Sequence, residues 1–376
     1  MTSPPYDVID DEMRQRLQRT SPHNVVRLLL PEGGDERYQT AARLLAEWQQ
    51  DGVLVRDGAP RFYLYEMDYP HGTGVRTARG VLGGLALLPL GDRVLPHEET
   101  MDKFRRDRAA LLAATGANLD PIIVLSPAAG LAALLRPPGP PRLDFAAGGL
   151  RHRLYDVADP GATAAIAAAV DSAPVAIADG HHRYTTALAH ARRRHEEDGA
   201  GEWDRVLAFV APAAGGGLRI DPVHRVFDPA AFHVDAVTDV FELSEALPRR
   251  PERPGDLVVV TGRGAGPGPW LLHPREEALA ALPEPWRTAG PAVARELLYP
   301  RLGLAEADAH YLHRAGDAVA YTELHRGSLA VLTAPIDEAT VAGASRQGLC
   351  FPQKTTYYFP KPRAGLVLRP LDGQPK

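Results

Sequence analysis

The stretch that decides the fold is Pro174-Val-Ala-Ile-Ala-Asp-Gly-His-His-Arg183. Residues 174–178 are a short apolar run of the kind that forms a buried strand. A helix follows, because apolar side chains then recur at the i, i+3, i+4 and i+7 positions of one helix face. These positions are Tyr184, Ala187, Leu188 and Ala191. The sequence therefore predicts a strand, a tight polar turn and a helix in direct succession.

The polar turn of this junction places charged and imidazole side chains where the helix begins. A helix N-terminus exposes backbone N–H groups and the positive end of the helix dipole. Gly180 lets a ligand approach the backbone closely, and His181, His182 and Arg183 add donors, so the turn predicts a pocket for an anion such as phosphate. Asp179 has the opposite sign, which suits a metal ion or a substrate ammonium group. The alternative is that Asp179 caps the helix and the two histidines are surface residues.

A second motif, Pro96-His97-Glu98-Glu99-Thr100, leads into Lys103 on a helix predicted over 101–114. A carboxylate with a histidine neighbour can serve as a general base. Two glutamates at a helix start are also what the helix dipole favours for stability alone. The chain has four lysines, Lys103, Lys354, Lys361 and Lys376, among many arginines. Because arginine takes most of the basic positions in this chain, a lysine marks a position where a compact point charge is needed.

Two further motifs carry chemistry-bearing side chains. In Pro352-Gln-Lys-Thr-Thr-Tyr-Tyr358, Lys354 lies beside two hydroxyls and two aromatic rings. The alternative for this segment is an edge strand on which the lysine prevents further pairing. The pair His224-Arg225 follows a predicted strand and is interpreted as structural.

Composition excludes several classes of protein. The 376 residues hold 42 Lys and Arg against 47 Asp and Glu, a net charge of −5, which does not favour nonspecific nucleic-acid binding. The single cysteine, Cys350, excludes an intramolecular disulfide and a cysteine-rich zinc site. No apolar run approaches the roughly 18 residues of a membrane helix, and the first residues lack a signal-peptide pattern. The sequence predicts a cytoplasmic protein with no membrane segment.

Strand and helix patterns alternate along the chain, which predicts a mixed α/β (α+β) fold. We divide the chain into segments 1–90, 91–250 and 251–376. Strands are expected at 24–30, 61–66, 81–90, 122–125, 205–210 and 258–260, and helices at 35–50 and 161–169.

Taken together, these motifs resemble the domain-of-unknown-function family 1015 over essentially the whole chain. The resemblance is carried by Pro4-Pro-Tyr-Asp-Val-Ile9, His23-Asn-Val-Val-Arg-Leu28, the Pro96–Thr100 motif, Ala178-Asp-Gly-His-His-Arg-Tyr184, the Pro352–Tyr358 motif and Gly365-Leu-Val367. Family members usually begin with some two dozen more residues before the Pro-Pro-Tyr-Asp turn.

The junction also resembles the phosphate-binding turn of the ParB-like superfamily, which includes nucleotide-binding partition proteins, sulfiredoxins and free serine kinases. The resemblance implies a ParB/SerK-like core over 91–250, with small α/β segments at both ends. In the kinase branch it implies Glu98, Asp179 and His181 as catalytic residues, with Glu98 as the base and Asp179 on Mg²⁺ or the substrate ammonium. The residues implied to bind the cofactor are His97, Thr100, Lys103, Gly180, His182, Arg183 and Lys354.

The function implied by this resemblance is a small-molecule kinase that phosphorylates the hydroxyl of free L-serine or a similar amino acid. ATP, ADP or pyrophosphate would be the donor, with Mg²⁺, and the sequence does not choose among them. The alternatives are a non-catalytic nucleotide-binding switch, as in partition proteins, and another phosphate-handling enzyme such as a phosphatase or an ATP-dependent ligase. The acidic composition and the lack of a visible helix-turn-helix argue against a DNA partner. Oligomeric state is left open.

Overall fold

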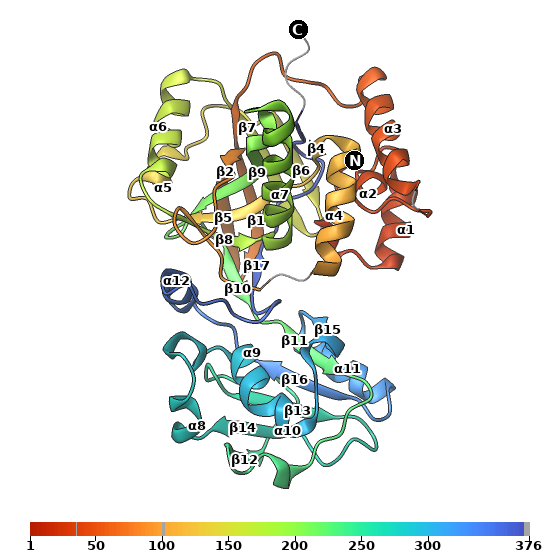
Figure 1. Cartoon of the computed structure of the whole chain (residues 1–376), viewed down its shortest axis with the longest axis vertical. Coiled ribbons are helices and arrows are strands. Elements are labelled where there is room, and N and C mark those ends of the chain that lie inside the picture. Colours follow the sequence, from red (N-terminus) through yellow and green to blue (C-terminus); the bar gives the residue numbers. More distant parts are fainter. Residues whose placement is uncertain (35, 100–101, 372–376) are drawn as a thin grey trace. The chain divides into compact units, whose positions relative to one another are not determined.

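The computed structural model describes residues 1–34, 36–99 and 102–371, and the side chains of residues 102–105 lie outside that description. The chain forms two compact units (Figure 1). The first unit comprises Met1–Leu95, Thr100–Leu218 and Pro360–Lys376. The second unit comprises Pro96–Glu99 and Arg219–Phe359.

A mixed eight-stranded sheet organises the first unit, in the order β3-β8-β5-β9-β2-β1-β7-β6. Its strands are β1 (Phe62–His71), β2 (Gly74–Ala86), β3 (Val94–Leu95), β5 (Ile122–Ser126), β6 (Leu143–Ala147), β7 (Leu150–Val157), β8 (Val175–Asp179) and β9 (Arg205–Pro212). The pairs β3–β8 and β5–β9 are parallel, and the other neighbours are antiparallel. A separate short pair joins β4 (Ala117–Asn118) to β18 (Arg369–Pro370).

Helices pack against this sheet and against one another. They are η1 (Tyr6–Val8), α1 (Asp11–Thr20), α2 (Val26–Leu29), α3 (Arg37–Gln50), α4 (Asp102–Thr115), α5 (Leu131–Leu134), α6 (Pro160–Asp171), α7 (His181–Asp198) and η2 (Glu202–Asp204). Helix α7 contacts β5, β9 and α4, and α4 in turn contacts α3 (Figure 1). Tyr184 and Ala187 of α7 are buried in the same apolar cluster as Ile122 and Ile177, so the predicted apolar face of α7 is its packing face.

The structure confirms the mixed α/β class and the predicted junction, because β8 runs into Asp179 and α7 begins at His181. The strand predicted over 24–30 is wrong, since Val26–Leu29 is the short helix α2. The Asn24 Oδ1 atom accepts a hydrogen bond from the Val26 N–H at 3.1 Å, which starts this turn. A short buried apolar run does not distinguish a strand from a helix by periodicity, and here the surrounding helices decide.

The structure groups the chain differently from the three predicted segments. Residues from segment 1–90 and from segment 91–250 share one sheet, because β2 pairs with β9. The chain leaves the first unit after Leu218 and returns to it at Pro360. A sequence boundary based on proline-rich loops does not detect this, since strand pairing over a long sequence separation leaves no local signal.

The second unit is built on an antiparallel six-stranded sheet in the order β12-β14-β13-β16-β11-β15. Its strands are β11 (His224–Phe227), β12 (Phe241–Glu245), β13 (Leu257–Thr261), β14 (Trp270–Pro274), β15 (His310–Leu312) and β16 (Leu329–Thr333). A two-stranded ribbon pairs β10 (Arg219–Asp221) with β17 (Tyr357–Phe359).

Short helices complete this unit. They are η3 (Val234–Ala236), α8 (Glu276–Ala280), η4 (Glu284–Trp286), α9 (Gly290–Val293), η5 (Ala294–Leu298), α10 (Tyr299–Leu302), η6 (Glu306–Asp308), α11 (Ala315–Leu324) and α12 (Glu338–Arg346). The core of this unit is a cluster that includes Phe227, Phe241, Leu257 and Val331.

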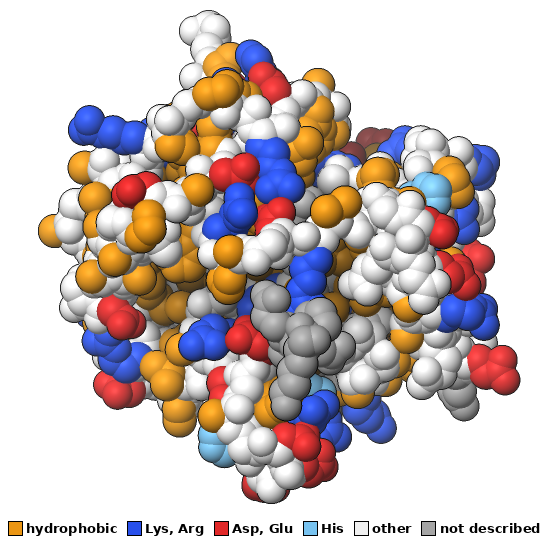
Figure 2. All heavy atoms as spheres, turned by 90° about the horizontal axis from the view of Figure 1, so that it is seen from above, with side chains coloured by type: hydrophobic (Ala, Val, Ile, Leu, Met, Phe, Trp, Pro, Cys, Tyr) orange, Lys and Arg blue, Asp and Glu red, His pale blue; other side chains and the backbone are white. Residues whose placement is uncertain are grey.

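Two observations concern the membrane and the nucleic acid that the sequence analysis considered as partners. Within the described part of the chain, no helix combines the length and the apolar character needed to cross a membrane. On the face shown in Figure 2, acidic and basic side chains are interspersed rather than gathered by sign. This face therefore does not present the basic patch that nonspecific nucleic-acid binding requires.

Each unit contains a buried histidine, and from these two residues we predict that the stability of the fold decreases in acid. Burial lowers the pKa of His152 in the first unit and of His224 in the second to about 4. An unfolded histidine has a pKa near 6.5. Between these values the unfolded chain binds more protons, so we expect the free energy of unfolding to fall as the pH drops from about 6.5 to 4, by on the order of 3 kcal/mol per histidine.

Denaturant unfolding of the wild type and of His152→Gln at pH 7, 5.5 and 4 measures this effect. The variant should lose less stability on acidification than the wild type, because its side chain does not titrate. His195→Gln, which replaces a histidine at an exposed position, provides the control. Equal acid sensitivity in the wild type and His152→Gln would contradict the assignment.

Candidate functional site

The Asp179–His181 turn is shaped by a glycine that no other residue replaces without strain. Gly180 has φ of 95°, in the left-handed region, and directly precedes α7. A Cβ atom added to Gly180 would lie 2.7 Å from the Ile122 Cγ2 atom. The Tyr184 N–H donates to the Gly180 carbonyl, one helical turn back along the chain, at 2.9 Å. This turn therefore leads directly into the N-terminus of the 18-residue helix α7, where the first backbone N–H groups of the helix lie.

Arg183 is engaged inside the first unit. Its Nη1 atom donates to Asp120 Oδ2 and to the Pro121 carbonyl, each at 2.6 Å, and its Nη2 atom donates to Asp179 Oδ2 at 2.6 Å. The Arg183 side chain is 10% exposed. Burial raises the pKa of the Asp120 carboxyl, and the Arg183 guanidinium opposes that rise. In this arrangement Arg183 ties the turn to the start of β5 instead of pointing to solvent.

Lys361 is a functional candidate that the motif analysis did not select. Its Nζ atom lies between two carboxylates, donating to Asp7 Oδ2 at 3.0 Å and forming a close ion pair with Asp179 Oδ1. The side chain is 5% exposed. The signals for it were its rarity as a lysine and its place beside the resemblance motifs. Asp7, Asp120, Asp179, Arg183 and Lys361 together form what we call the aspartate cluster.

The aspartate cluster does not fit a magnesium ion bound through Asp179. Both carboxylate oxygens of Asp179 accept hydrogen bonds from cations, Lys361 and Arg183. Over the described residues, no group of three or more His, Cys, Asp and Glu side chains is placed to hold a metal ion. Mg²⁺ prefers carboxylate oxygens that are not already neutralised by cations. Asp179 is therefore not assigned to magnesium.

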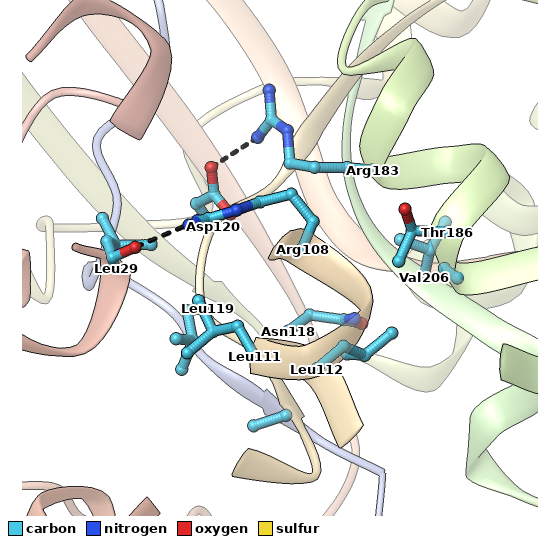
Figure 3. Close-up of a pocket in the computed structure, with 12 residues that line it drawn as sticks. Leu29, Arg108, Leu111, Leu112, Asn118, Leu119, Asp120, Arg183, Thr186 and Val206 are labelled. Carbon is cyan, nitrogen blue, oxygen red and sulfur yellow. Dashed lines mark hydrogen bonds and ion pairs between the residues drawn. The ribbon is translucent and has the colours of Figure 1, made fainter. Parts of the chain in front are cut away.

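A small cavity lies behind Arg183, between α4 and α7 (Figure 3). Its volume is about 50 Å³, which holds a few water molecules but not a nucleotide. Asp120, Arg108 and Arg183 form its polar side, and the Arg108 Nη1 atom donates to the Leu29 carbonyl at 3.0 Å. The other walls are mostly apolar, including Leu111, Leu112, Leu119 and Val206, with Asn118 and Thr186 as further polar residues. The cavity is thus too small to be the donor site.

Glu98 lies in the second unit, where a loop holds its carboxylate. Glu98 Oε1 accepts from the Thr356 N–H and from the Thr356 hydroxyl, each at 2.8 Å. Glu98 Oε2 accepts from the Lys354 N–H at 3.2 Å. The His97 ring is fully buried, and its Nε2 atom lies 2.9 Å from Thr356 Oγ1. Hydrogen-bond donors therefore converge on a carboxylate whose side chain is 12% exposed.

The structure thus places the predicted site residues in two groups. Asp179, Gly180, His181, His182 and Arg183 belong to the first unit. His97, Glu98 and Lys354 belong to the second. Thr100 lies outside the described residues, and Lys103 lies in α4 with its side chain outside the description. His181 is buried and His182 is partly exposed.

Comparison with known families assigns the chain. A family model described as "Protein of unknown function (DUF1015)" matches residues 1–280. Because this match spans most of the chain, the protein belongs to the DUF1015 family, as the motifs predicted. A search of curated proteins found no match.

Solved structures show a more distant similarity. A conserved hypothetical protein from Pyrococcus furiosus is 14% identical, with a TM-score of 0.40, 74% of this chain covered and 90% of the other. A mutant of free serine kinase in complex with ADP is 14% identical, with a TM-score of 0.40 and coverage of 74% and 87%. SbnI from Staphylococcus aureus, with a C-terminal truncation, is 13% identical, with a TM-score of 0.44 and coverage of 77% and 87%. Similarity at this level establishes neither fold nor activity, so the ParB-like relationship stays a prediction.

Proposed function

We propose that this protein is a phosphotransferase that moves a phosphoryl group from a nucleotide or pyrophosphate to the hydroxyl of free L-serine or a similar amino acid. The observation that carries the proposal is the turn before α7, where a left-handed Gly180 precedes the N–H groups of a long helix and two histidines. Helix N-termini of this kind bind phosphate, because backbone donors and the helix dipole both favour negative charge.

The proposed reaction is a single displacement at phosphorus. The acceptor hydroxyl oxygen forms a bond to the phosphorus atom, and the bond from that phosphorus to the bridging oxygen of the donor breaks. The electron pair of the broken bond stays on the departing donor product, and the hydroxyl proton goes to the Glu98 carboxylate. Such transfer depends on in-line placement and charge stabilisation more than on covalent help from the protein.

The contacts of the first unit support distinct roles for its residues. The backbone around Gly180, with His181 and His182, is assigned to the phosphate oxygens. Arg183 is assigned to holding the turn, because its guanidinium is occupied by Asp120 and Asp179. Lys361 supplies a second positive charge to Asp179.

Incubation of the purified protein with L-serine and, separately, ATP, ADP and pyrophosphate in magnesium buffer tests the proposal. Mass spectrometry and phosphorus NMR should detect phosphoserine with at least one donor. His182→Ala should lower the rate, whereas His195→Ala, on the exposed last turn of the same helix, should not. Absence of a phosphorylated amino acid with all three donors, for L-serine and for other hydroxyl amino acids such as L-threonine, would refute the kinase assignment.

One observation favours the alternative of a nucleotide-binding switch without turnover. The two cations on Asp179 leave this residue poorly suited to a metal ion, and metal ions are common partners in phosphoryl transfer. Calorimetric titration with the same nucleotides separates the two functions, because a switch binds nucleotide and forms no phosphoserine.

A further inference from the structure

Glu98 is held by donors from two sides of one loop, residues 351–356. The loop is fixed to the Pro96–Glu99 segment by backbone hydrogen bonds, from Phe351 N–H to the His97 carbonyl at 2.8 Å and from Glu99 N–H to the Phe351 carbonyl at 3.1 Å. Because these bonds flank Glu98 in the chain, the Glu98 side chain and the loop keep one mutual orientation.

The first of two hydrogen-bond chains, which we call arms, runs from His97 through the Thr356 hydroxyl to Glu98. A threonine hydroxyl has one proton, and the geometry directs it to Glu98 Oε1 at 2.8 Å. The His97 Nε2 atom, 2.9 Å from the same hydroxyl, must then be the donor in that contact. The buried imidazole therefore orients the hydroxyl so that its proton faces the carboxylate.

The second arm runs from Arg225 through a single peptide group. The Arg225 Nη2 atom donates to the Gln353 carbonyl at 3.0 Å, and the N–H of the same peptide, that of Lys354, donates to Glu98 Oε2 at 3.2 Å. Arg225 is fully buried, and its Nε and Nη1 atoms bind Glu306 and the Val223 carbonyl. A cation on the carbonyl polarises the peptide and strengthens the N–H as a donor.

Backbone conformation is the third element of this arrangement. Lys354 has φ of 54°, and among the residues that the structure describes it is the one non-glycine residue in the left-handed region. Such a conformation costs about 1–3 kcal/mol and persists only where the surrounding structure enforces it. At this position the N–H groups of Lys354 and Thr356 both donate to the Glu98 carboxylate. The strained residue therefore belongs to the loop that binds Glu98.

We propose that Thr356 and Arg225 are positioning residues for Glu98, acting with His97 and the Lys354 peptide to fix the carboxylate that accepts the substrate proton. This inference rests on the proposed function, because it assumes that Glu98 acts as the base. It gives a function to Arg225, which the sequence motif indicated as structural, and it assigns Lys354 a role through its backbone rather than its ammonium group.

The test compares matched threonine variants of the full chain. Thr356→Val removes the hydroxyl, Thr356→Ser retains it, and Thr355→Val is the control, because the buried Thr355 hydroxyl donates to the Pro352 carbonyl instead of Glu98. With L-serine and the active donor, we expect Thr356→Val to lower kcat by about 10- to 100-fold with little change in KM, since a hydrogen bond to a charged group is lost. Thr356→Ser should restore most of kcat, and Thr355→Val should stay near the wild type. A Thr356→Val variant with wild-type kcat overturns the proposal.

A second measurement tests the positioning of Glu98 without relying on kinase activity. Hydrogen exchange with residue-level fragmentation reports the Lys354 and Thr356 amides in the wild type, Glu98→Ala and Arg225→Lys. We expect faster exchange at both amides in Glu98→Ala and at the Lys354 amide in Arg225→Lys. If the wild type makes no phosphoserine but exchange accelerates as expected, the kinase assignment fails and the positioning of Glu98 is supported. Unchanged exchange at both amides overturns the positioning itself.

Discussion

Replacing Arg183 with methionine is expected to destabilise the first unit by about 3–5 kcal/mol, the cost of removing one partner from a buried ion pair. The Arg183 guanidinium binds Asp120, Asp179 and the Pro121 carbonyl at once. Its removal leaves the Asp120 side chain, which is 9% exposed, without its hydrogen-bonded cation. Denaturant unfolding at pH 7 measures the loss. Arg194→Met is the matched control on the same helix, because its pair with Asp198 is exposed and contributes little.

The stability defect of this variant relative to the wild type should itself depend on pH. Burial raises the pKa of Asp120, and Arg183 opposes that rise in the wild type. Without Arg183 the folded pKa rises further, so the folded state binds a proton that the unfolded chain releases near pH 4. The defect should therefore be small at low pH and grow as the pH rises through the folded pKa. A defect of equal size from pH 4 to 7, or no relief in the Arg183→Met and Asp120→Asn double variant, would count against this explanation.

Replacing Glu98 with glutamine is expected to lower kcat for serine phosphorylation by about 10²- to 10⁴-fold, the usual contribution of a general base. Glutamine has the same shape, and its side-chain oxygen still accepts from one of the two amides, of Thr356 or Lys354, while its NH₂ group faces the other N–H. We expect KM to change little, and denaturant unfolding checks that the fold is retained. Rates of phosphoserine formation over a range of serine concentrations measure both constants.

Glu99→Gln is the matched control for this change. Glu99 is the next residue, carries the same charge, is 54% exposed and pairs with Arg295. Its replacement should leave kcat within about threefold of the wild type, because surface ion pairs contribute little. If Glu98→Gln and Glu99→Gln behave alike, Glu98 is not the base.

Local pattern was enough to predict the junction at the centre of the first unit. A run of apolar residues, a polar turn with glycine and a 3.6-residue apolar period specify β8, the turn and α7 within a few residues. The same kind of pattern failed at Val26–Leu29, because a short stretch in which three of four residues are buried apolar side chains suits either secondary structure. There the neighbouring helices selected the helical form.

The amino-acid sequence by itself determined the mixed α/β class, the glycine turn before α7 and the types of side chain that gather there, because each depends on neighbours within a few positions. The tertiary structure alone decided the partners of those side chains. Arg183 pairs with Asp120, which is 63 residues away, and Lys361 reaches Asp179 across 182 residues. Thr356 reaches Glu98 across 258 residues. Such pairings depend on how whole elements pack. The sequence around a charged residue does not indicate which distant residue of opposite charge will lie beside it.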